Sequence, residues 1–209
     1  MSFLLQLSML KKLAQEALNE DYSISGAELS EETLQNVPFA KLEFNSTSFT
    51  RCKFINCDFT KANFIACSLK ECDFSNCVFT DSYFKKTVMS DCKGSGAKFI
   101  KSVFKQSSLT GCLFQYANLS ESAWQDCNLK DISFKESFLN EVSFKKTNFQ
   151  KVDFTRADFF KTMLKGVDLS DCIITGIMLS DNLRELSGCE LNVFQAAEIA
   201  RLLGVIIKY

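Results

Sequence analysis

The chain has 209 residues, of which 46% are apolar, and 24 Lys and Arg nearly balance 25 Asp and Glu for a formal net charge of -1. Composition alone therefore indicates neither a basic nucleic-acid binder nor a strongly acidic protein. The sequence contains no His, so the commonest general base of enzymes is missing. No apolar run reaches the ~18 residues that a membrane-spanning helix needs. We expect a cytoplasmic protein with reduced cysteines.

The first predicted element is an amphipathic helix over residues 3–18, within an N-terminal capping segment of residues 1–21. Ser2 can serve as its N-cap. Lys11 and Lys12 are its only cations, which favours a helix that caps the following array over one that lies on a membrane. No positive charge precedes the apolar residues and no cleavage site follows them, so we expect no signal peptide. The apolar stripe contains Phe3, Leu7, Leu10, Ala14 and Ala17.

A five-residue repeat occupies the middle of the chain, and its register is unbroken from Leu34 to Leu179. Of the 30 positions at this spacing, 17 are Phe and nine are Leu, and the residue two places before each is usually small. A period of five fits neither the 3.6 residues of a helical turn nor the two of a strand. It predicts a solenoid in which the central and small residues point inward and the other three face water.

This pattern resembles that of the pentapeptide-repeat family, as in C-D-F-T-K (57–61) and A-D-F-F-K (157–161). The resemblance implies an all-β solenoid, a right-handed quadrilateral β-helix whose four sides close one turn every twenty residues. Coils about 4.8 Å apart would build a rod over residues 22–182. A coil filled by aromatic rings is expected to leave no interior pocket for an active site. The predicted core ladder includes Phe54, Phe59, Phe64, Phe74, Phe79, Phe104, Phe114, Phe144 and Phe154.

Nine of the ten cysteines occupy the small inward position of the repeat. We interpret them as small buried packing residues. A redox or metal role is the alternative, because four of them are expected to stack on one corner of the rod. Cys189 lies outside the array and has no assigned role. The stacked four are Cys52, Cys72, Cys92 and Cys112.

Residues 93–96 (K-G-S-G) interrupt the column of large centres. Gly94 predicts an inward hole between the layers of Phe74 and Phe114. One interpretation is a kink or bulge that marks a contact site, since two glycines relax the backbone. The other is a neutral defect filled by the neighbouring rings. Trp124 at another centre is interpreted as a bulkier core residue.

The chain then leaves the repeat and ends in a second helix. Residues 192–195 (N-V-F-Q) form a predicted capping box, the helix spans residues 193–203, and Gly204 stops it. Residues 205–209 predict a short apolar strand, with residues 189–191 as its partner. Such a tail either caps the last coil or meets a second copy across a two-fold axis.

Residues 186–207 resemble the C-terminal module of the Qnr-type quinolone-resistance proteins and related gyrase-protecting pentapeptide proteins. The shared features are Gln195-Ala196 in a helix, then Leu203-Gly204 and β-branched residues. The resemblance implies that residues 183–209 join two chains tail to tail. The repeat lacks the loops of the enteric members, so a mechanism that needs those loops is not implied. The implied dimer interface contains Phe194, Leu202, Leu203, Val205, Ile206, Ile207 and Tyr209.

A twenty-residue coil sorts the charges onto separate faces. The face centred on Phe44 and its equivalents contains six lysines against two acidic residues, and the face centred on Phe39 mixes acidic residues with lysines. The family resemblance implies that a rod of DNA-like width docks where gyrase binds its DNA segment. A solvated surface is the alternative for both faces. The candidate partner surface contains Asp58, Asp81, Glu121, Glu141, Asp158, Lys85, Lys86, Lys105 and Lys145.

The sequence predicts a binding protein and no enzyme, with no catalytic, cofactor or metal site. The resemblance implies a homodimer that binds DNA gyrase or topoisomerase IV and protects it from quinolones or a natural gyrase poison. Neither a small-molecule substrate, nor direct nucleic-acid binding, nor a membrane is expected. The alternative is a scaffold or adaptor for an unrelated protein. Phe138, Phe160 and Met178 fall at outward positions near the C-terminal end and predict an apolar contact, covered by the dimer or by the folded-back tail.

Overall fold

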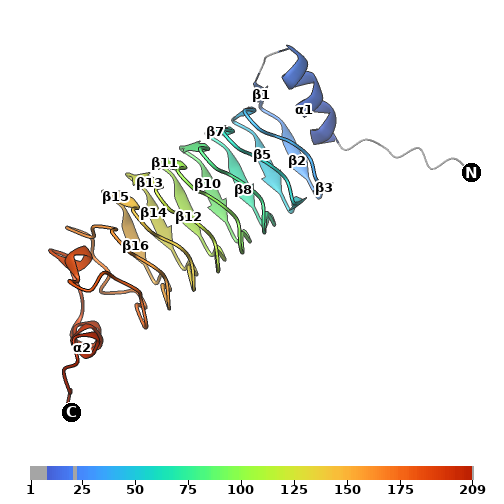
Figure 1. The fold of residues 1–209 in the computed structure, drawn as a ribbon. Helices are drawn as coiled ribbons and strands as arrows, with labels where there is room; N and C mark the ends of the chain where they lie inside the picture. The colour runs from blue at the N-terminus through green and yellow to red at the C-terminus, as the bar shows by residue number, and fades with distance from the viewer. Residues whose placement is uncertain (1–8, 21–22, 209) are drawn as a thin grey trace, which may run out of the picture.

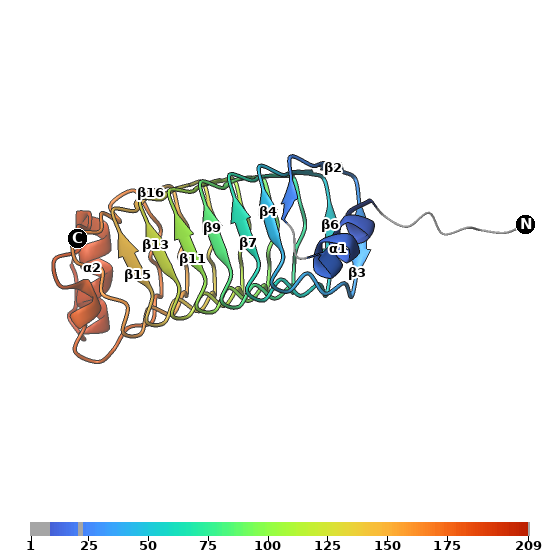
Figure 2. The same ribbon diagram turned by 90° about the horizontal axis from the view of Figure 1, so that it is seen from above.

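The computed structural model describes residues 9–20 and 23–208. It is a rod of stacked coils with helix α1 (Met9–Glu20) at one end and helix α2 (Val193–Leu202) at the other (Figure 1). Seen from above, the two helices flank the ladder of strands (Figure 2). The predicted solenoid with a helix at each end is therefore confirmed.

Two parallel sheets run along the rod as far as β15 and β16, and each consists of seven three-residue strands apart from the shorter β1. The first contains β1 (Ile24–Ser25), β4 (Glu43–Asn45), β7 (Asn63–Ile65), β9 (Tyr83–Lys85), β11 (Val103–Lys105), β13 (Ala123–Gln125) and β15 (Ser143–Lys145). The second contains β2 (Glu28–Ser30), β5 (Ser48–Thr50), β8 (Ser68–Lys70), β10 (Val88–Ser90), β12 (Ser108–Thr110), β14 (Asn128–Lys130) and β16 (Asn148–Gln150).

The pairing register confirms the twenty-residue coil. Phe44 is aligned with Phe64, and Phe64 with Phe84. The other two sides are held by the short pair β3 (Thr33–Gln35) and β6 (Lys53–Ile55) and by single-residue parallel bridges such as Asp58 with Val78. Four sides therefore close each turn.

The last residue of each repeat turns the corner between two sides. Asn56 and Lys61 adopt left-handed φ angles of 51° and 60° there. This conformation is costly for residues that carry a Cβ, and the stacked coils hold it in place. Gly96, with a φ of 67°, occupies the same corner position. It is therefore an ordinary corner and no bulge.

Aromatic stacking fills the interior. Phe39, Phe59, Phe79 and Phe99 lie one above another with successive ring centroids 4.8 Å apart. This spacing matches that of hydrogen-bonded strands, so Phe59 and Phe79 each stack on a ring of the coil on both sides. Trp124 is buried as expected, and its Nε1 donates to Ser122 Oγ at 3.0 Å.

The expected hole at Gly94 does not exist. A Cβ on Gly94 would lie 2.6 Å from Phe114 Cε1 and 2.8 Å from Phe74 Cε2, so the two rings already occupy that space. The backbone is unkinked, because Gly94 N donates to Leu113 O in the next coil at 2.8 Å. The interpretation of a neutral defect filled by neighbouring rings is confirmed.

The N-terminal helix packs its predicted stripe onto the first coil, since Leu10, Ala14 and Ala17 are buried in the common core. The helix extends to Glu20, two residues beyond the predicted end. Ser2, Phe3, Leu7 and the expected array start near Tyr22 lie outside the described residues.

The C-terminal helix begins at Val193 as predicted, with both halves of the Asn192–Gln195 capping box present, and ends at Leu202, one residue before the predicted end. The strand predicted at residues 205–209 was wrong. Residues 205–208 form no strand, and Val205 N instead donates to Ala200 O at 3.1 Å, closing the helix end. Glu190 pairs in parallel with Asp168 of the rod, so it cannot partner the tail. The 3-10 helix η1 (Arg184–Leu186) joins the rod to this segment.

Candidate binding surfaces of the wall and the C-terminal end

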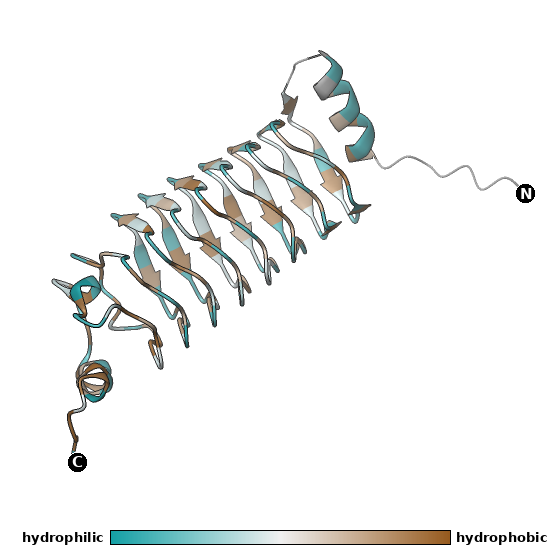
Figure 3. Cartoon of the chain, viewed as in Figure 1, coloured by the Kyte–Doolittle hydropathy of each residue, from teal (hydrophilic) through white to brown (hydrophobic). Residues whose placement is uncertain are grey.

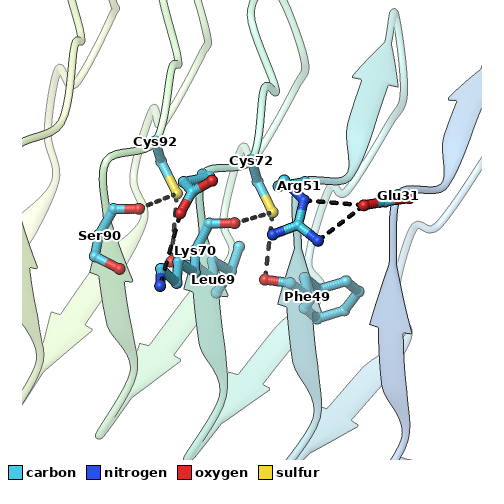
Figure 4. Close-up of polar contacts among 9 residues, drawn as sticks. Glu31, Phe49, Arg51, Leu69, Lys70, Cys72, Ser90 and Cys92 are labelled. Atoms are coloured by element: carbon cyan, nitrogen blue, oxygen red, sulfur yellow. Dashed lines mark hydrogen bonds and ion pairs between the residues drawn. The ribbon is translucent and has the colours of Figure 1, made fainter.

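The cysteine column is packing that also makes weak hydrogen bonds. Cys72 Sγ donates to Phe49 O and Lys70 O, both at 3.4 Å (Figure 4). Cys92 Sγ bonds in the same way one coil later. Nine cysteines are buried and Cys189 is half-buried. The prediction that the nine fill the small inward position is confirmed, although the sequence did not indicate these bonds.

Threonine and serine make the same corner bond. Thr87 Oγ1 donates to Phe64 O at 2.9 Å, and Thr47 Oγ1 donates to Ile24 O at 3.0 Å. The small position thus suits a short side chain with a donor. Burial raises the pKa of the Cys67 thiol, so it stays protonated. Among the described residues, His, Cys, Asp and Glu nowhere gather in threes as a metal ion would need.

The mixed-charge face is internally compensated. Glu121 lies 3.6 Å from Lys101 Nζ, and Glu141 lies 3.0 Å from Lys161 Nζ. Asp58 and Asp158 are half-buried and accept bonds from the backbone N–H two residues later, whereas Asp81 is exposed. The five predicted carboxylates therefore share one side of the rod without making it strongly acidic.

The lysine face behaves differently. Lys85 lies on β9, Lys105 on β11 and Lys145 on β15, all in the first sheet, with Lys86 at the adjoining corner. Within the described part of the chain, none of these four side chains makes an ion pair within 4.0 Å. This side of the rod therefore presents uncompensated positive charge.

The outward apolar residues of the mixed-charge face are exposed, as predicted. Phe138 and Met178 flank Asp158 in one column of bridges, and Phe160 lies beside them with its ring 5.3 Å from Lys161 Nζ. Nothing in the described structure covers them. Neither the folded-back tail nor the helix α2 serves as their cover within one chain.

The C-terminal end presents a larger apolar surface, which we call the end face. Its members are exposed side chains on α2 and the segment after it, where the ribbon is brown by hydropathy (Figure 3). Phe194 is 74% and Ile206 is 85% exposed, so this end of the chain presents large apolar side chains to solvent. Ile207 is half-buried, and Tyr209 lies outside the described residues. The end face comprises Val193, Phe194, Leu202, Leu203, Val205 and Ile206.

The predicted core ladder is buried except at one residue. Phe144 is partly exposed, although its equivalents Phe104 and Trp124 on the same sheet are fully buried. The exposure coincides with a cavity of about 580 Å³ after β15 and β16, which departs from the expectation of a rod without pockets. Neither described helix has the length and apolar character of a transmembrane segment.

Comparison with known proteins finds one matching family and several similar solved structures. The model of the pentapeptide repeat region matches residues 47–115 and 107–182. No curated protein matches the chain. A trypsin-treated form of QnrB1, a plasmid-mediated fluoroquinolone resistance protein, is 21% identical with a TM-score of 0.58, over 89% of this chain and 93% of that chain. HetL, a pentapeptide repeat protein of heterocyst differentiation regulation from the cyanobacterium Nostoc, is 14% identical with a TM-score of 0.33, over 88% and 95% of the two chains.

Proposed function

Because the chain belongs to the pentapeptide-repeat family, we propose that it is a non-catalytic binding protein that docks with DNA gyrase or topoisomerase IV. In this proposal the rod occupies the site where the enzyme holds a DNA segment and thereby protects the enzyme from quinolones or a natural gyrase poison. The protein acts in the cytoplasm and needs no cofactor.

The whole length of the rod supports this proposal. The superposition with the trypsin-treated form of QnrB1, a fluoroquinolone resistance protein, extends over 93% of that chain and 89% of this one. A narrow rod offers a shape that a DNA-binding channel can accept. The charges contribute less, since Lys101 and Lys161 offset Glu121 and Glu141 on the mixed-charge face. The shape of the rod therefore contributes more to the proposed docking than its charges do.

The observation that carries the proposed homodimer is the end face on α2 and the segment after it. The exposed side chains of Val193, Phe194 and Leu202 form an apolar surface on this helix that is costly in water. An identical patch on a second chain can cover it across a two-fold axis. We propose residues 183–209 as this dimerisation module. The resulting dimer would double the length of the rod and present the same sides at both ends.

Gyrase supercoiling assays with and without ciprofloxacin test the proposed function. We expect the protein at micromolar concentration to restore supercoiling in the presence of the drug or to inhibit it in its absence. If gyrase and topoisomerase IV both behave as though the protein were absent, the enzyme-binding proposal fails, and an unrelated protein partner takes its place.

The dimer has a separate test. Phe194→Asp and Ile206→Asp place a charge in the end face without disturbing the rod, because both side chains are already exposed. We expect these variants to sediment as monomers. The matched control is Tyr116→Asp, a 59% exposed residue of the wall, which should leave the dimer intact. A wild-type monomer, or variants that remain dimeric, would refute the assignment without affecting the gyrase test.

A further inference from the structure

The two long sheets end before the repeat does. β15 and β16 are the last strands of their sheets, yet Leu164 and Leu169 continue the column of inward centres in register. Both leucines are buried, so residues 162–171, which form two sides of the next coil, still contribute to the core. In Figure 1 this coil follows the last arrows as an irregular trace. The backbone pairing has stopped while the inward packing continues.

The forward bonds of the preceding coil show what is missing. Asp126 N donates to Lys145 O at 3.0 Å, which joins that coil to the next. The equivalent amide one turn later is Lys146 N, and it makes no hydrogen bond with any described residue. Lys151 N, a further forward amide, donates instead to the side chain of Asp171 at 3.2 Å.

The backward bonds are missing in the same place. Ser143 N donates back to Ser122 O at 3.0 Å, and Asn148 N donates back to Cys127 O at 2.9 Å. Their equivalents one turn later, the amides of Met163 and Asp168, have no acceptor in the described chain. Two facing edges of backbone are therefore unpaired.

The C-terminal segment explains why the two backbone edges are separated. Leu164 N donates to Glu185 O at 2.8 Å, Gly166 N to Gly188 O at 2.8 Å, and Leu169 N to Glu190 O at 3.0 Å. Residues 185–190 thus bind the far side of this coil. Leu164, Gly166 and Leu169 therefore keep their forward partners. The backbone amides of Met163 and Asp168 have lost their backward ones, whereas the side chain of Thr162 still donates back to Leu139 O.

The resulting gap is a cavity of about 580 Å³, which we call the slot. Ligand sites typically occupy ~300–1,000 Å³, so the slot is large enough for a short chain segment. Its inner wall includes the ring of Phe144. The residues at the equivalent position of other coils are buried, whereas Phe144 is partly exposed. One apolar contact is therefore available between the two unpaired edges.

The half of the slot beside β15 is positively charged. Lys145 and Lys146 lie on one side and Lys165 on the other, and none of them makes an ion pair with a described residue. The half beside β16 contains Asp168 and Asp171, whose carboxylates already accept bonds from Ser170 N and Lys151 N. Three lysines therefore face two carboxylates in the slot, and its positive charge is gathered beside β15.

We propose that the slot binds an extended, acidic peptide segment of a partner protein as an added strand beside β15. An unpaired strand edge offers alternating N–H and C=O groups that another strand satisfies, whereas phosphates offer acceptors alone. In such a strand, alternate carboxylates face the three lysines of the slot and the side chain between them contacts Phe144. The site is independent of the proposed enzyme target.

A fluorescein-labelled Glu-Val-Glu-Val-Glu peptide is the probe for this site. We expect saturable binding in fluorescence anisotropy, and no binding by the same peptide N-methylated at its valines, because methylation removes the strand-pairing donors. Lys145→Glu and Lys165→Glu should each weaken binding at least about tenfold, since like charges then face the peptide. Lys85→Glu, on the same face but three coils before Lys145, should change it less than about twofold.

Several results would overturn the proposal. One is no binding up to about 1 mM peptide, which corresponds to a negligible affinity. Another is equal binding of a Lys-Val-Lys-Val-Lys peptide or of the N-methylated probe. Equal loss in Lys85→Glu would place the peptide on the lysine face outside the slot. Tighter binding of a single-stranded DNA oligonucleotide that competes with the peptide would make the slot a nucleic-acid site instead.

Discussion

Residues 122–131 and residues 162–171 each form two sides of a coil, and they have the same repeat but different surroundings. The first bonds to its neighbours on both sides and completes a closed wall, and the second bonds forward to residues 185–190 and leaves the slot behind it. The pattern A-W-Q-D of the wall and M-L-K-G of the end place their inward residues alike. The repeat therefore determines which side chains are inside, while the neighbouring backbone determines whether a coil is paired.

The largest expected difference between the two regions is in the free energy of unfolding that is lost when a core ring is truncated. Phe99→Ala removes a fully buried ring stacked 4.8 Å from Phe79 and should lower the free energy of unfolding by about 3–5 kcal/mol. Phe144→Ala, at the slot, should cost less, about 1–2 kcal/mol, because its ring is already partly exposed. Urea unfolding followed by circular dichroism measures both.

Phe99→Leu is the control, since Leu is the second commonest residue at these centres. It should recover much of the loss in Phe99→Ala. Equal destabilisation by Phe99→Ala and Phe144→Ala would mean that the slot is closed in solution and that the two regions do not differ.

Glu185 fastens the end of the rod and gives the next largest effect. Its buried carboxylate accepts bonds from Ser180 Oγ at 2.7 Å and from Lys161 N at 3.0 Å. Glu185→Ala should cost about 1.5–3 kcal/mol, measured by urea unfolding, because these donors lose a charged acceptor. Glu141→Ala, which breaks only an exposed ion pair with Lys161, should cost less than about 1 kcal/mol. Similar losses would show that Glu185 does not hold the segment.

The same carboxylate predicts a pH dependence. Burial opposes its ionisation, but the bonds from Ser180 and Lys161 hold the pKa of Glu185 below its ordinary value of 4.5. A lowered folded-state pKa means that this stabilisation is complete above about pH 4.5 and is lost as the pH falls through the folded-state value. The acid loss of stability should be smaller in Glu185→Gln than in the wild type.

Sequence alone specified the coil but not its pairing at the end. The column from Leu34 to Leu179 predicted the inward residues, because burial follows a local period, and the family resemblance implied the twenty-residue register. Nothing in residues 162–166 distinguishes that side from a paired one. The bonds of Leu164 and Leu169 to residues far along the chain depend on tertiary contacts that have no local pattern.

The C-terminal end was predictable in part. The capping box and Gly204 fixed the limits of α2, since caps are local chemistry. The β-branched residues 205–207 indicated a strand, but propensity does not supply an edge to pair with, and Glu190 is already used by Asp168. For the same reason the sequence could suggest the apolar end face and could not indicate the slot.

Gly94 gives a smaller effect and tests how tightly the wall is closed. Gly94→Ala should cost about 1–3 kcal/mol in urea unfolding, because the new methyl group overlaps the rings of Phe74 and Phe114. Ser95→Ala, beside it but facing outward, should stay within about 0.5 kcal/mol of the wild type. A neutral or stabilising Gly94→Ala would show that the rings leave a hole there.

The rate of cysteine labelling involves no change in stability and probes the wall and the C-terminal end in one experiment. Burial, reinforced by the charges of Asp168 and Glu190, raises the pKa of Cys189 to about 11. In the native protein iodoacetamide should therefore label Cys189 slowly at neutral pH, and about tenfold faster for each unit of pH toward 11, since the thiolate reacts. Mass spectrometry should find Cys92 of the wall unlabelled. Comparable labelling of Cys92 in folded protein would contradict a closed wall.

Residue-resolved amide hydrogen exchange compares the closed wall with the open end most directly. We expect strong protection of Asp126, Ser143 and Asn148, and exchange of their equivalents Lys146, Met163 and Asp168 that is faster by about 1,000-fold or more. Equal protection within the three pairs would contradict it, because the end would then be paired like the wall and the slot would not exist.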